Sequence, residues 1–412
     1  MISKNTICRD CGSTKLHMFI DLTDQAPANA FLRPEQIADE RAYPLRAYVC
    51  EDCQLVQLTD IVDIDELFQN YVYLTAGAGP TTPKHFTDYA QSVVQTFSLN
   101  EESLVVELGS NDGLLLSAFQ NAGVTHVVGV DPAKNVAEIA NERGVPTIAA
   151  PWGKEVALKI KKNEGLADVI IGNNVVAHIE DHKGLMAGVV TLLKEDGVFI
   201  FEAPYLMDMF ERLAFDTIYH EHLACLSLRP IKRLVEKFGM EGFDMHLTPA
   251  QGVSMRVFIG KKGAHTILAS VSEFEEKELS LHLDEVKTYH ELAERITNRK
   301  NELLELLQDL KKQGKRIAGY GAPAKGNTLL NYGKIGPEIL DYLTEELPSK
   351  VGLLSPGMHI PVVHVNDARN NPPDYFLMLA WNYSEKILEN EAELRAKGVK
   401  FIIPIGEKIQ IV

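Results

Sequence analysis

Short apolar runs alternate with amphipathic stretches through the middle of the chain. The apolar runs predict buried strands, at 103–108, 127–130, 167–172 and 197–202. Apolar residues at helical spacing predict helices over 83–97, after Leu114 and over 184–194. Because alternating strands and helices are typical of a parallel sheet with helices on both faces, the sequence predicts an α/β fold of the Rossmann type.

A second pattern of this kind occupies the C-terminal third. Residues 275–312 carry apolar positions three and four apart, which predicts one or two long amphipathic helices. An apolar run at 316–320 then leads through a glycine-containing loop into a helix that begins at Asn327. Further strand-like runs lie at 375–380 and 400–404. We therefore predict a second, Rossmann-like α/β unit.

The N-terminal stretch follows neither pattern. Strand-like runs at 45–49 and 55–58 flank a C-x-x-C pair, which predicts a hairpin with the cysteines at its turn. We predict three units: a small N-terminal unit over 1–75, an α/β unit over 76–265 and a C-terminal α/β unit over 266–412.

Four of the five cysteines form two C-x-x-C pairs: Cys8 with Cys11, and Cys50 with Cys53. Two such knuckles brought together give a tetrahedral four-thiolate site, the geometry that zinc accepts. All four positions are then sulfur, so the zinc is structural and supplies folding energy to a unit with little core of its own. The alternative is two redox dithiols, but a redox C-x-x-C usually opens a helix rather than a hairpin.

Composition narrows the classes of partner. The chain of 412 residues carries a formal net charge of −16 and has no Lys/Arg-rich block, so we expect no nucleic-acid partner. No run of eighteen apolar residues and no apolar leader occurs, so we expect no membrane span and a cytoplasmic location. The sequence leaves the oligomeric state open between monomer and dimer.

A glycine turn follows the first strand of the middle unit. It reads Glu107-Leu-Gly109-Ser-Asn111-Asp112-Gly113 and runs directly into the predicted helix. This spacing lacks the closely placed glycines of a dinucleotide site, although a nicotinamide dinucleotide stays the alternative. The turn resembles that of class I methyltransferases, which implies that Gly109 lets the backbone approach S-adenosyl-L-methionine.

Polar residues also end the next strands of this unit. Asp131 ends the second, where an acidic side chain typically accepts hydrogen bonds from ribose hydroxyls. Asn173, Asn174 and His178 follow the third. Because the carboxyl ends of parallel strands share one edge of the sheet, we predict that these residues bind the same cofactor as the glycine turn.

The most unusual local string is Tyr219-His220-Glu221-His222, which follows the fourth strand. A histidine is suited to proton transfer near neutral pH. The zinc-protease pattern H-E-x-x-H fails because position 224 is alanine. A metal pair of His220 and His222, or two simply packed histidines, are the alternatives.

The whole set of motifs resembles the sugar C-methyltransferases, of which the mycarose-pathway 3-C-methyltransferases are examples. The motifs occur in the family's order: the two C-x-x-C pairs, VELGSNDG, GNNVVAH, FEAPYL, DTIYHEH and the C-terminal GYGAPAKGNTLLN. The resemblance spans nearly the entire chain. It implies an enzyme that methylates a carbon of a nucleoside-diphosphate 4-keto-6-deoxyhexose, next to the ketone and at C-3.

The resemblance also implies roles for particular residues. His222 is the general base that forms the enolate, with Tyr219, His220 and Glu221 around the sugar. Further substrate-binding residues are implied at seven positions: Tyr71, Tyr73, Ser254, Arg256, Tyr320, Lys325 and His359. The sequence departs from the family at 75–79, where relatives carry a serine-rich stretch, and at 251–256, where they read H-G-G-S-x-R.

Two other functions fit parts of the pattern. A methyltransferase acting on oxygen or nitrogen of a similar sugar needs no carbanion. Alternatively, the C-terminal glycine loop binds a nucleotide for regulation and the protein is a zinc-stapled binding module, or this unit only covers the active site. The YHEH string beside the cofactor edge favours an enzyme over a binding module.

Overall fold

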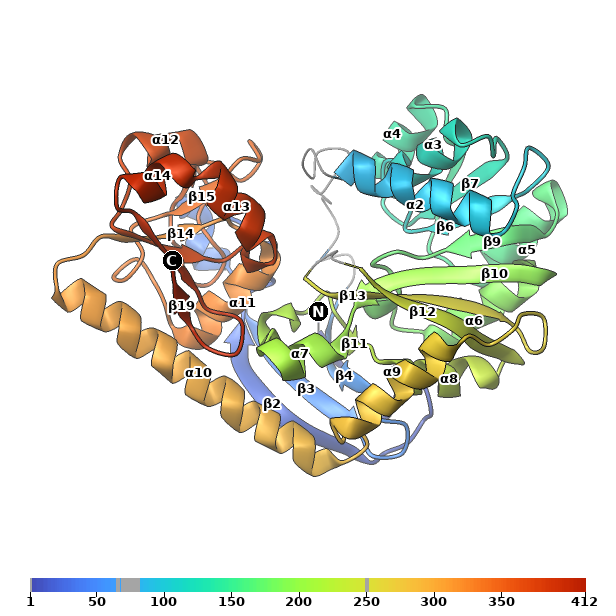
Figure 1. Cartoon of the computed structure of the whole chain (residues 1–412), viewed down its shortest axis with the longest axis horizontal. Coiled ribbons are helices and arrows are strands. Elements are labelled where there is room, and N and C mark those ends of the chain that lie inside the picture. Colours follow the sequence, from blue (N-terminus) through green and yellow to red (C-terminus); the bar gives the residue numbers. More distant parts are fainter. Residues whose placement is uncertain (1, 64–66, 68–81, 249–251) are drawn as a thin grey trace.

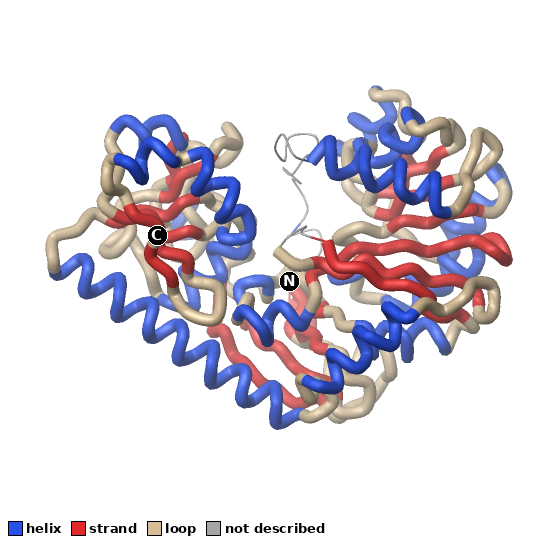
Figure 2. The backbone as a smooth tube through the Cα atoms, in the orientation of Figure 1, coloured by secondary structure: helices blue, strands red, loops and turns tan. Residues whose placement is uncertain are grey.

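The computed structural model describes residues 2–63, 67, 82–248 and 252–412. Two α/β units lie on opposite sides, and the N-terminal strands and one long helix join them from below (Figure 1). The tube view shows the same division, with a red sheet flanked by blue helices in each α/β unit (Figure 2). The chain thus follows the α/β fold class that the sequence predicts.

The middle unit is built on a seven-stranded sheet with the order β12-β13-β10-β9-β6-β7-β8. Its strands are β6 (Val105–Leu108), β7 (Val127–Asp131), β8 (Thr147–Ala149), β9 (Ala167–Ile171), β10 (Leu193–Pro204), β12 (Met240–Thr248) and β13 (Ser254–Lys261). The strands from β8 to β10 are parallel, whereas β13 is antiparallel to both β10 and β12. Its helices include α2 (Thr82–Thr96), α3 (Leu114–Asn121), α4 (Lys134–Glu142), α5 (Lys154–Glu164) and α6 (His182–Leu192).

The order of these strands positions the site. The chain leaves β6 toward β7 on one side and returns to β9 on the other, so β6 and β9 are neighbours at a topological switch point. Ligands of open α/β sheets bind in the crevice at the carboxyl ends of such strands. The residues after β6 and β9 are those that the sequence singles out.

The C-terminal unit is a six-stranded sheet with the order β16-β15-β14-β17-β18-β19. The strands are β14 (Ile317–Tyr320), β15 (Leu343–Glu345), β16 (Val362–His364), β17 (Tyr375–Met378), β18 (Lys400–Ile403) and β19 (Gln410–Ile411). All are parallel except β19, and β14 and β17 meet at a second switch point. The main helices are α11 (Ala324–Gly333), α12 (Val365–Asn370), α13 (Ser384–Asn390) and α14 (Ala392–Ala396).

Two helices connect the α/β units. The predicted stretch 275–312 is divided into α9 (Ala269–Ser280) and α10 (Val286–Lys312). In α10 a stripe three and four residues apart is buried: Tyr289, Leu292, Ile296, Arg299, Leu303, Leu307 and Leu310. The Arg299 guanidinium donates to the carbonyls of Pro404, Gly406 and Glu407, which fixes the C-terminal loop to the helix.

The N-terminal unit borrows a strand. Its own strands are β1 (Ile2–Lys4), β2 (Leu16–Gln25), β3 (Tyr43–Cys50), β4 (Val56–Leu58) and β5 (Asp60–Val62), with a 3-10 helix η1 (Pro34–Asp39). Its main sheet has the order β11-β4-β3-β2, and β11 (Ala224–Cys225) comes from the middle of the chain. Since β11 begins two residues after His222, the cysteine-bearing hairpin is joined directly to the YHEH string.

The middle unit also contains the short helices η3 (Val176–His178), η4 (Phe215–Thr217), α7 (Leu206–Arg212) and α8 (Leu228–Glu236). Among the helices described, none is both long enough and apolar enough to cross a membrane.

Candidate active site and metal centre

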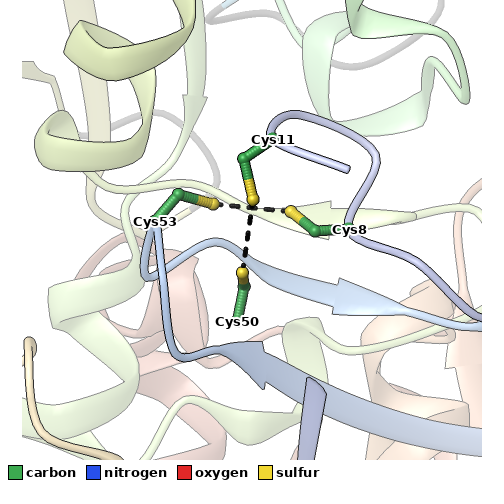
Figure 3. A group of neighbouring side chains, drawn as sticks. All are labelled: Cys8, Cys11, Cys50 and Cys53. Atoms are coloured by element: carbon green, nitrogen blue, oxygen red, sulfur yellow. Dashed lines mark hydrogen bonds between the residues drawn. The ribbon is translucent and has the colours of Figure 1, made fainter. Parts of the chain in front are cut away.

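The four predicted cysteine ligands converge. The four sulfur atoms lie within 4.8 Å of one another, and all point toward a common centre (Figure 3). The Sγ atoms of Cys8 and Cys53 are 3.4 Å apart, and those of Cys11 and Cys50 are 3.5 Å apart. In a tetrahedral zinc site with Zn–S bonds of about 2.3 Å the sulfurs stand about 3.8 Å apart, so the cluster fits zinc closely.

Both knuckles use the same backbone turn. The amide of Gly12 donates to the carbonyl of Cys8, and the amide of Gln54 donates to that of Cys50, each at 2.8 Å. Gly12 has a φ of 80° and Gln54 a φ of 64°, so each knuckle closes with one residue in the left-handed region. The turn brings the two cysteines of each pair to one side, which the C-x-x-C spacing predicts.

A cation is needed to ionise all four thiols. Hydrogen bonds from Cys53 and Cys8 lower the pKa of Cys50 well below its ordinary value, whereas hydrogen bonding with Cys50, together with burial, raises the pKa of Cys8 to about 12 and raises that of Cys53 as well. All five cysteines of the chain are reduced. A bound metal ion reverses this shift because it deprotonates the thiols that coordinate it. The donor set and its spacing therefore fit a structural zinc ion with no open coordination position.

The glycine turn after β6 approaches the switch point closely. Gly109 has a φ of 62°, and a Cβ atom there would meet Val175 at 2.3 Å, so only glycine fits. Asn111 follows with a φ of 49°, and Gly113 precedes α3 with a φ of 77°. Three residues in the left-handed region turn the chain sharply between the end of β6 and the start of α3.

Two carboxyl groups converge behind this turn. Asp131 accepts hydrogen bonds from the amides of Asn111 at 2.9 Å and Ala133 at 2.8 Å. Glu107 is buried, and its Oε2 atom has no hydrogen-bond partner among the described residues. Burial and the charge of Asp131 raise the pKa of Glu107 well above its ordinary value. This orphaned acceptor suits a ligand that brings hydroxyl or ammonium donors, as S-adenosylmethionine does.

The other predicted cofactor residues lie at the same edge with different contacts. Asp112 forms an ion pair with Arg143 at 2.8 Å. The Asn173 side chain accepts from the amide of Glu202 at 3.1 Å, and the amide of Asn174 donates to the carbonyl of Glu202 at 2.7 Å. These bonds tie the loop after β9 to β10 and fix the second wall of the crevice.

His222 has a fixed tautomer. Its Nδ1 atom lies 2.7 Å from the carbonyl oxygen of Thr217, and its Nε2 atom lies 2.8 Å from the hydroxyl of Tyr219. Because a carbonyl can only accept, Nδ1 carries the hydrogen and Nε2 is the basic nitrogen, which accepts from Tyr219. Burial lowers the pKa of His222 well below its ordinary value. The imidazole is therefore neutral near pH 7 and able to accept a proton.

His178 lies beside this base. Its ring meets the ring of His222 edge to face, with centroids 4.8 Å apart. Burial lowers the pKa of His178 to about 4, so this ring is neutral too. The sequence predicts His178 as a cofactor residue, and the structure places it where the cofactor edge and the YHEH string meet.

The two middle residues of YHEH face the N-terminal unit. The Nε2 atom of His220 lies 3.2 Å from the carbonyl oxygen of Tyr43, and its ring packs edge-on against that tyrosine. The Glu221 carboxyl accepts from the Asn29 amide at 2.7 Å, and burial raises the pKa of Glu221 to about 7. The string thus presents Tyr219 and His222 to each other and anchors the loop through the residues between them.

Ser254 and Arg256 stand next to each other on β13. Ser254 is fully buried. The Arg256 guanidinium pairs with Glu202, its Nε atom 2.7 Å from the carboxylate, and stacks over the ring of Tyr89 at 3.9 Å. Glu202 and Tyr89 thus hold the Arg256 side chain in place. The contact of Ser254 and Arg256 with the sugar stays a prediction.

The predicted substrate residues of the C-terminal unit lie apart from one another. Lys325, in the first turn of α11, lies 4.5 Å above the ring of Trp381. Tyr320 donates to Glu391 at 2.7 Å, and His359 pairs with Glu40 at 2.7 Å, which joins this unit to the N-terminal one. Tyr71 and Tyr73 lie outside the described residues.

No sequence motif identifies several polar residues of the site. Asn29 contacts Glu221, Thr217 fixes His222 through its backbone, and His182 contacts the first cysteine knuckle. Asp216 accepts from the indole N–H of Trp381 at 2.7 Å. None of these forms a motif; only the position of Asp216 and Thr217 within the DTIYHEH string gave a signal.

The fold and this edge define a class I methyltransferase that uses S-adenosylmethionine. Family models match three successive parts of the chain: "Putative zinc binding domain" at 8–68, "Methyltransferase domain" at 84–243 and "C-methyltransferase C-terminal domain" at 249–406. The chain is 37% identical to C-methyltransferase NovU of Streptomyces niveus over 97% of this chain and 95% of that protein. The chain therefore belongs to this C-methyltransferase family, with S-adenosylmethionine and zinc as its cofactors.

Solved structures match about half of the chain. Magnesium protoporphyrin IX methyltransferase ChlM of Synechocystis PCC 6803, with bound SAM, is 14% identical and covers 49% of this chain and 98% of its own, with a TM-score of 0.35. Plantazolicin methyltransferase BpumL in complex with a pentazolic desmethylPZN analog and SAH is 13% identical, covers 48% of this chain and 91% of its own, and has a TM-score of 0.37. The family assignment rests on the whole-chain relative and the three family models.

Proposed function

We propose that the enzyme methylates a ring carbon next to the ketone, C-3, of a nucleoside-diphosphate 4-keto-6-deoxyhexose. His222 is the general base. The observation that carries this proposal is the fixed tautomer of His222, whose Nδ1–H is committed to the Thr217 carbonyl while Nε2 stays basic. Alkylation of carbon needs a carbanion equivalent, so a C-methyltransferase needs a base of this kind near its cofactor edge.

The keto-sugar fits this requirement because its carbonyl acidifies the neighbouring C–H bond. Nε2 of His222 takes that proton, and the bonding electrons move into the enolate. The hydroxyl of Tyr219, released from Nε2 when that nitrogen takes the proton, then donates to the developing oxyanion. Bound S-adenosylmethionine supplies the electrophilic methyl group, whose C–S bond breaks as the new C–C bond forms.

The remaining assignments follow the three units, with bounds of 1–75, 76–265 and 266–412. The carboxyl edge of β6, β7 and β9 holds the cofactor through Glu107, Gly109, Asn111 and Asp131. The C-terminal unit holds the nucleotide-sugar, with Lys325 its buried cation. Support for this comes from two contacts that bring α11 to the site: Thr328 donates to the carbonyl of Ile218, and Asn327 to that of Ala28.

The test combines methyl transfer with hydrogen exchange. The protein, S-adenosylmethionine and freshly generated dTDP- or GDP-4-keto-6-deoxyhexose are incubated in deuterated water and followed by mass spectrometry and NMR. We expect one methyl group on the ring carbon beside the ketone. In His222→Asn we expect the rate to fall by about 10²–10⁴-fold with unchanged S-adenosylmethionine binding, because only the base is lost.

The matched control is His246→Asn, which replaces a histidine on β12 that pairs with Asp244 at 2.8 Å. It should methylate at the wild-type rate. Deuterium exchange without methylation identifies the correct enolate on the wrong sugar. A fully active His222→Asn enzyme contradicts the assigned base, and the absence of both exchange and methylation with every keto-sugar contradicts the substrate class.

A further inference from the structure

Each cysteine knuckle is linked to a segment next to one of the two histidines of the site. The first knuckle contacts the segment that carries His178, and the second knuckle forms the turn of the hairpin that pairs with the segment after His222. These two segments are 44 residues apart in the chain, yet their rings meet at 4.8 Å. The cluster is therefore placed to set the relative position of the two rings.

The connection to His178 passes through a buried ion pair. Asp10, inside the first knuckle, lies 2.7 Å from Nδ1 of His182, and both side chains are at most 4% exposed. The Nε2 atom of His182 lies 3.0 Å from the carbonyl oxygen of Val176, so it carries the hydrogen of that bond. Val176 is the first residue of η3, and His178 is the last.

The connection to His222 passes through backbone pairing. In the β4–β11 ladder Gln57 is paired with Ala224 and Val56 with Cys225. The amide of Leu58 also donates to the carbonyl of Leu223, the residue after His222, at 3.0 Å. These bonds fix the position of the segment that follows His222 relative to the hairpin that carries Cys50 and Cys53.

We propose that His182 is a positioning residue for methyl transfer. Because it bonds both Asp10 and Val176, it fixes η3 relative to the first knuckle and thereby aligns His178 against the catalytic base. The N-terminal unit then acts as a clamp on the two histidines as well as a folding element. This inference rests on the proposed role of His222 and deepens it. A misplacement of about 1 Å at a reacting group lowers rates by about 10²-fold, so a small shift of η3 has a measurable consequence.

Three substitutions separate the two contacts of His182. In His182→Asn the amide occupies the place of Nδ1, so the contact with Asp10 is retained and that with Val176 is lost. In His182→Gln the amide reaches the place of Nε2 and still donates to Val176. His182→Ala loses both. We expect kcat to fall by at least about 10-fold in the Asn and Ala variants and to recover to within about 3-fold in the Gln variant, with unchanged KM for the keto-sugar.

Tyr289→Phe is the control for general loss of stability. It removes another buried hydrogen bond, from the Tyr289 hydroxyl to the carbonyl of Leu283 at 3.0 Å, at the start of α10. Its kcat should stay at the wild-type value, and every variant should retain one zinc per chain. An Asn variant with wild-type kcat, or a Tyr289→Phe variant with an equal loss of kcat, overturns the inference.

A second measurement needs no sugar. Long-range ¹H–¹⁵N spectra of the imidazole rings should show changed His178 and His222 signals in His182→Asn, and near-native signals in His182→Gln. Unchanged ring signals in His182→Asn, while His222→Asn is inactive, refute the positioning role alone. Changed ring signals together with an active His222→Asn enzyme retain the positioning role and refute the proposed base.

Discussion

The two α/β units use the same local design for different purposes. Each has a parallel sheet with a switch point, and each places a glycine turn there: Gly109 after β6 in the middle unit, and Gly321 after β14 in the C-terminal unit. The charged side chains next to the two turns differ in their partners. This difference shows how little a glycine turn alone says about a ligand.

The first turn leaves its polar groups directed at the crevice. Glu107 keeps an acceptor atom without a partner in the described structure, and burial raises the pKa of both Glu107 and Asp131. Such carboxyls cost free energy until a ligand supplies donors, and burial of this kind is typical of binding sites. These properties support the proposed role of this turn in cofactor binding.

The second turn places a cation between two units of the same chain. Lys325 lies over Trp381, at the end of β17, and opposite Asp216 of the middle unit. Burial raises the pKa of Asp216 to about 6 and lowers that of Lys325 to about 8. Both groups are thus charged together only between these values. The contacts at this switch point join the C-terminal unit to the middle unit.

The largest effect that separates the two turns is expected from Lys325→Met. The variant leaves Asp216 buried without its cation, so its pKa rises further. Its carboxyl must then either take up a proton or remain an unpaired charge. Removing one partner of a buried ion pair costs about 3–5 kcal/mol. We expect that loss in the free energy of unfolding at pH 7, where both groups are mainly charged, and a much smaller one at pH 5.5, where Asp216 is already largely protonated. Urea denaturation at the two pH values measures it.

The control is Lys386→Met, which removes an exposed lysine on α13 paired with Glu389. It should cost less than about 1 kcal/mol at either pH because exposed ion pairs contribute little. An equal loss for Lys325→Met at pH 5.5 and pH 7 contradicts an ion pair with Asp216. S-adenosylmethionine affinity should be unchanged in both variants, which keeps the second turn distinct from the first.

The opposite pattern is expected from Asp131→Asn. The amide places a donor against the backbone N–H of Asn111 or Ala133 and removes a charged acceptor for the ribose hydroxyls. Hydrogen bonds to a charged group contribute about 1.5–3 kcal/mol, so the dissociation constant of S-adenosylmethionine should rise by about 10- to 100-fold. Isothermal titration calorimetry measures this change.

Asp168→Asn is the matched control, because Asp168 lies near the start of β9, at the opposite end of the parallel strands from the cofactor edge. Asp168 also accepts a backbone hydrogen bond, from the amide of Leu104 at 2.8 Å, and pairs with Lys194. It should leave S-adenosylmethionine binding at the wild-type value. Equal weakening by both substitutions means that Asp131 acts through the stability of the sheet and not through the cofactor.

The parts that the sequence predicts well are periodic or local. Apolar runs locate β6, β7, β9, β14, β17 and β18 because a buried strand needs a continuous apolar segment. The C-x-x-C spacing predicts the cysteine cluster, since the knuckle is a turn of four residues. The common position of the turns after β6 and β9 follows from the parallel sheet that the sequence predicts, because the carboxyl ends of parallel strands share one edge.

Contacts between distant segments carry no such signal. His220 and His222 are two residues apart in an irregular loop, and the carbonyl groups of Tyr43 and Thr217 decide which way each ring faces. The two-residue strand β11 is too short for any periodicity. The ion pair of Asp10 with His182 spans 172 residues, so only the folded chain shows that the cysteine cluster contacts the active site.

The smallest effect tests whether the indole N–H holds the two units together. Trp381→Phe keeps a ring beneath Lys325 but removes the donor to Asp216, whose other oxygen has no hydrogen-bond partner among the described residues. A buried carboxylate that loses a hydrogen bond costs about 1–2 kcal/mol, so the free energy of unfolding should fall by that amount at pH 8. Trp152→Phe removes an indole bond to a neutral carbonyl, that of Leu185 at 3.2 Å, and should cost about 1 kcal/mol or less. The loss of unfolding free energy in Trp381→Phe should shrink at pH 5.5, where Asp216 is largely protonated, whereas the loss in Trp152→Phe should not.

A loss in Trp381→Phe that is independent of pH means that the indole supports packing alone. In that case the charge of Asp216 has no part in joining the units.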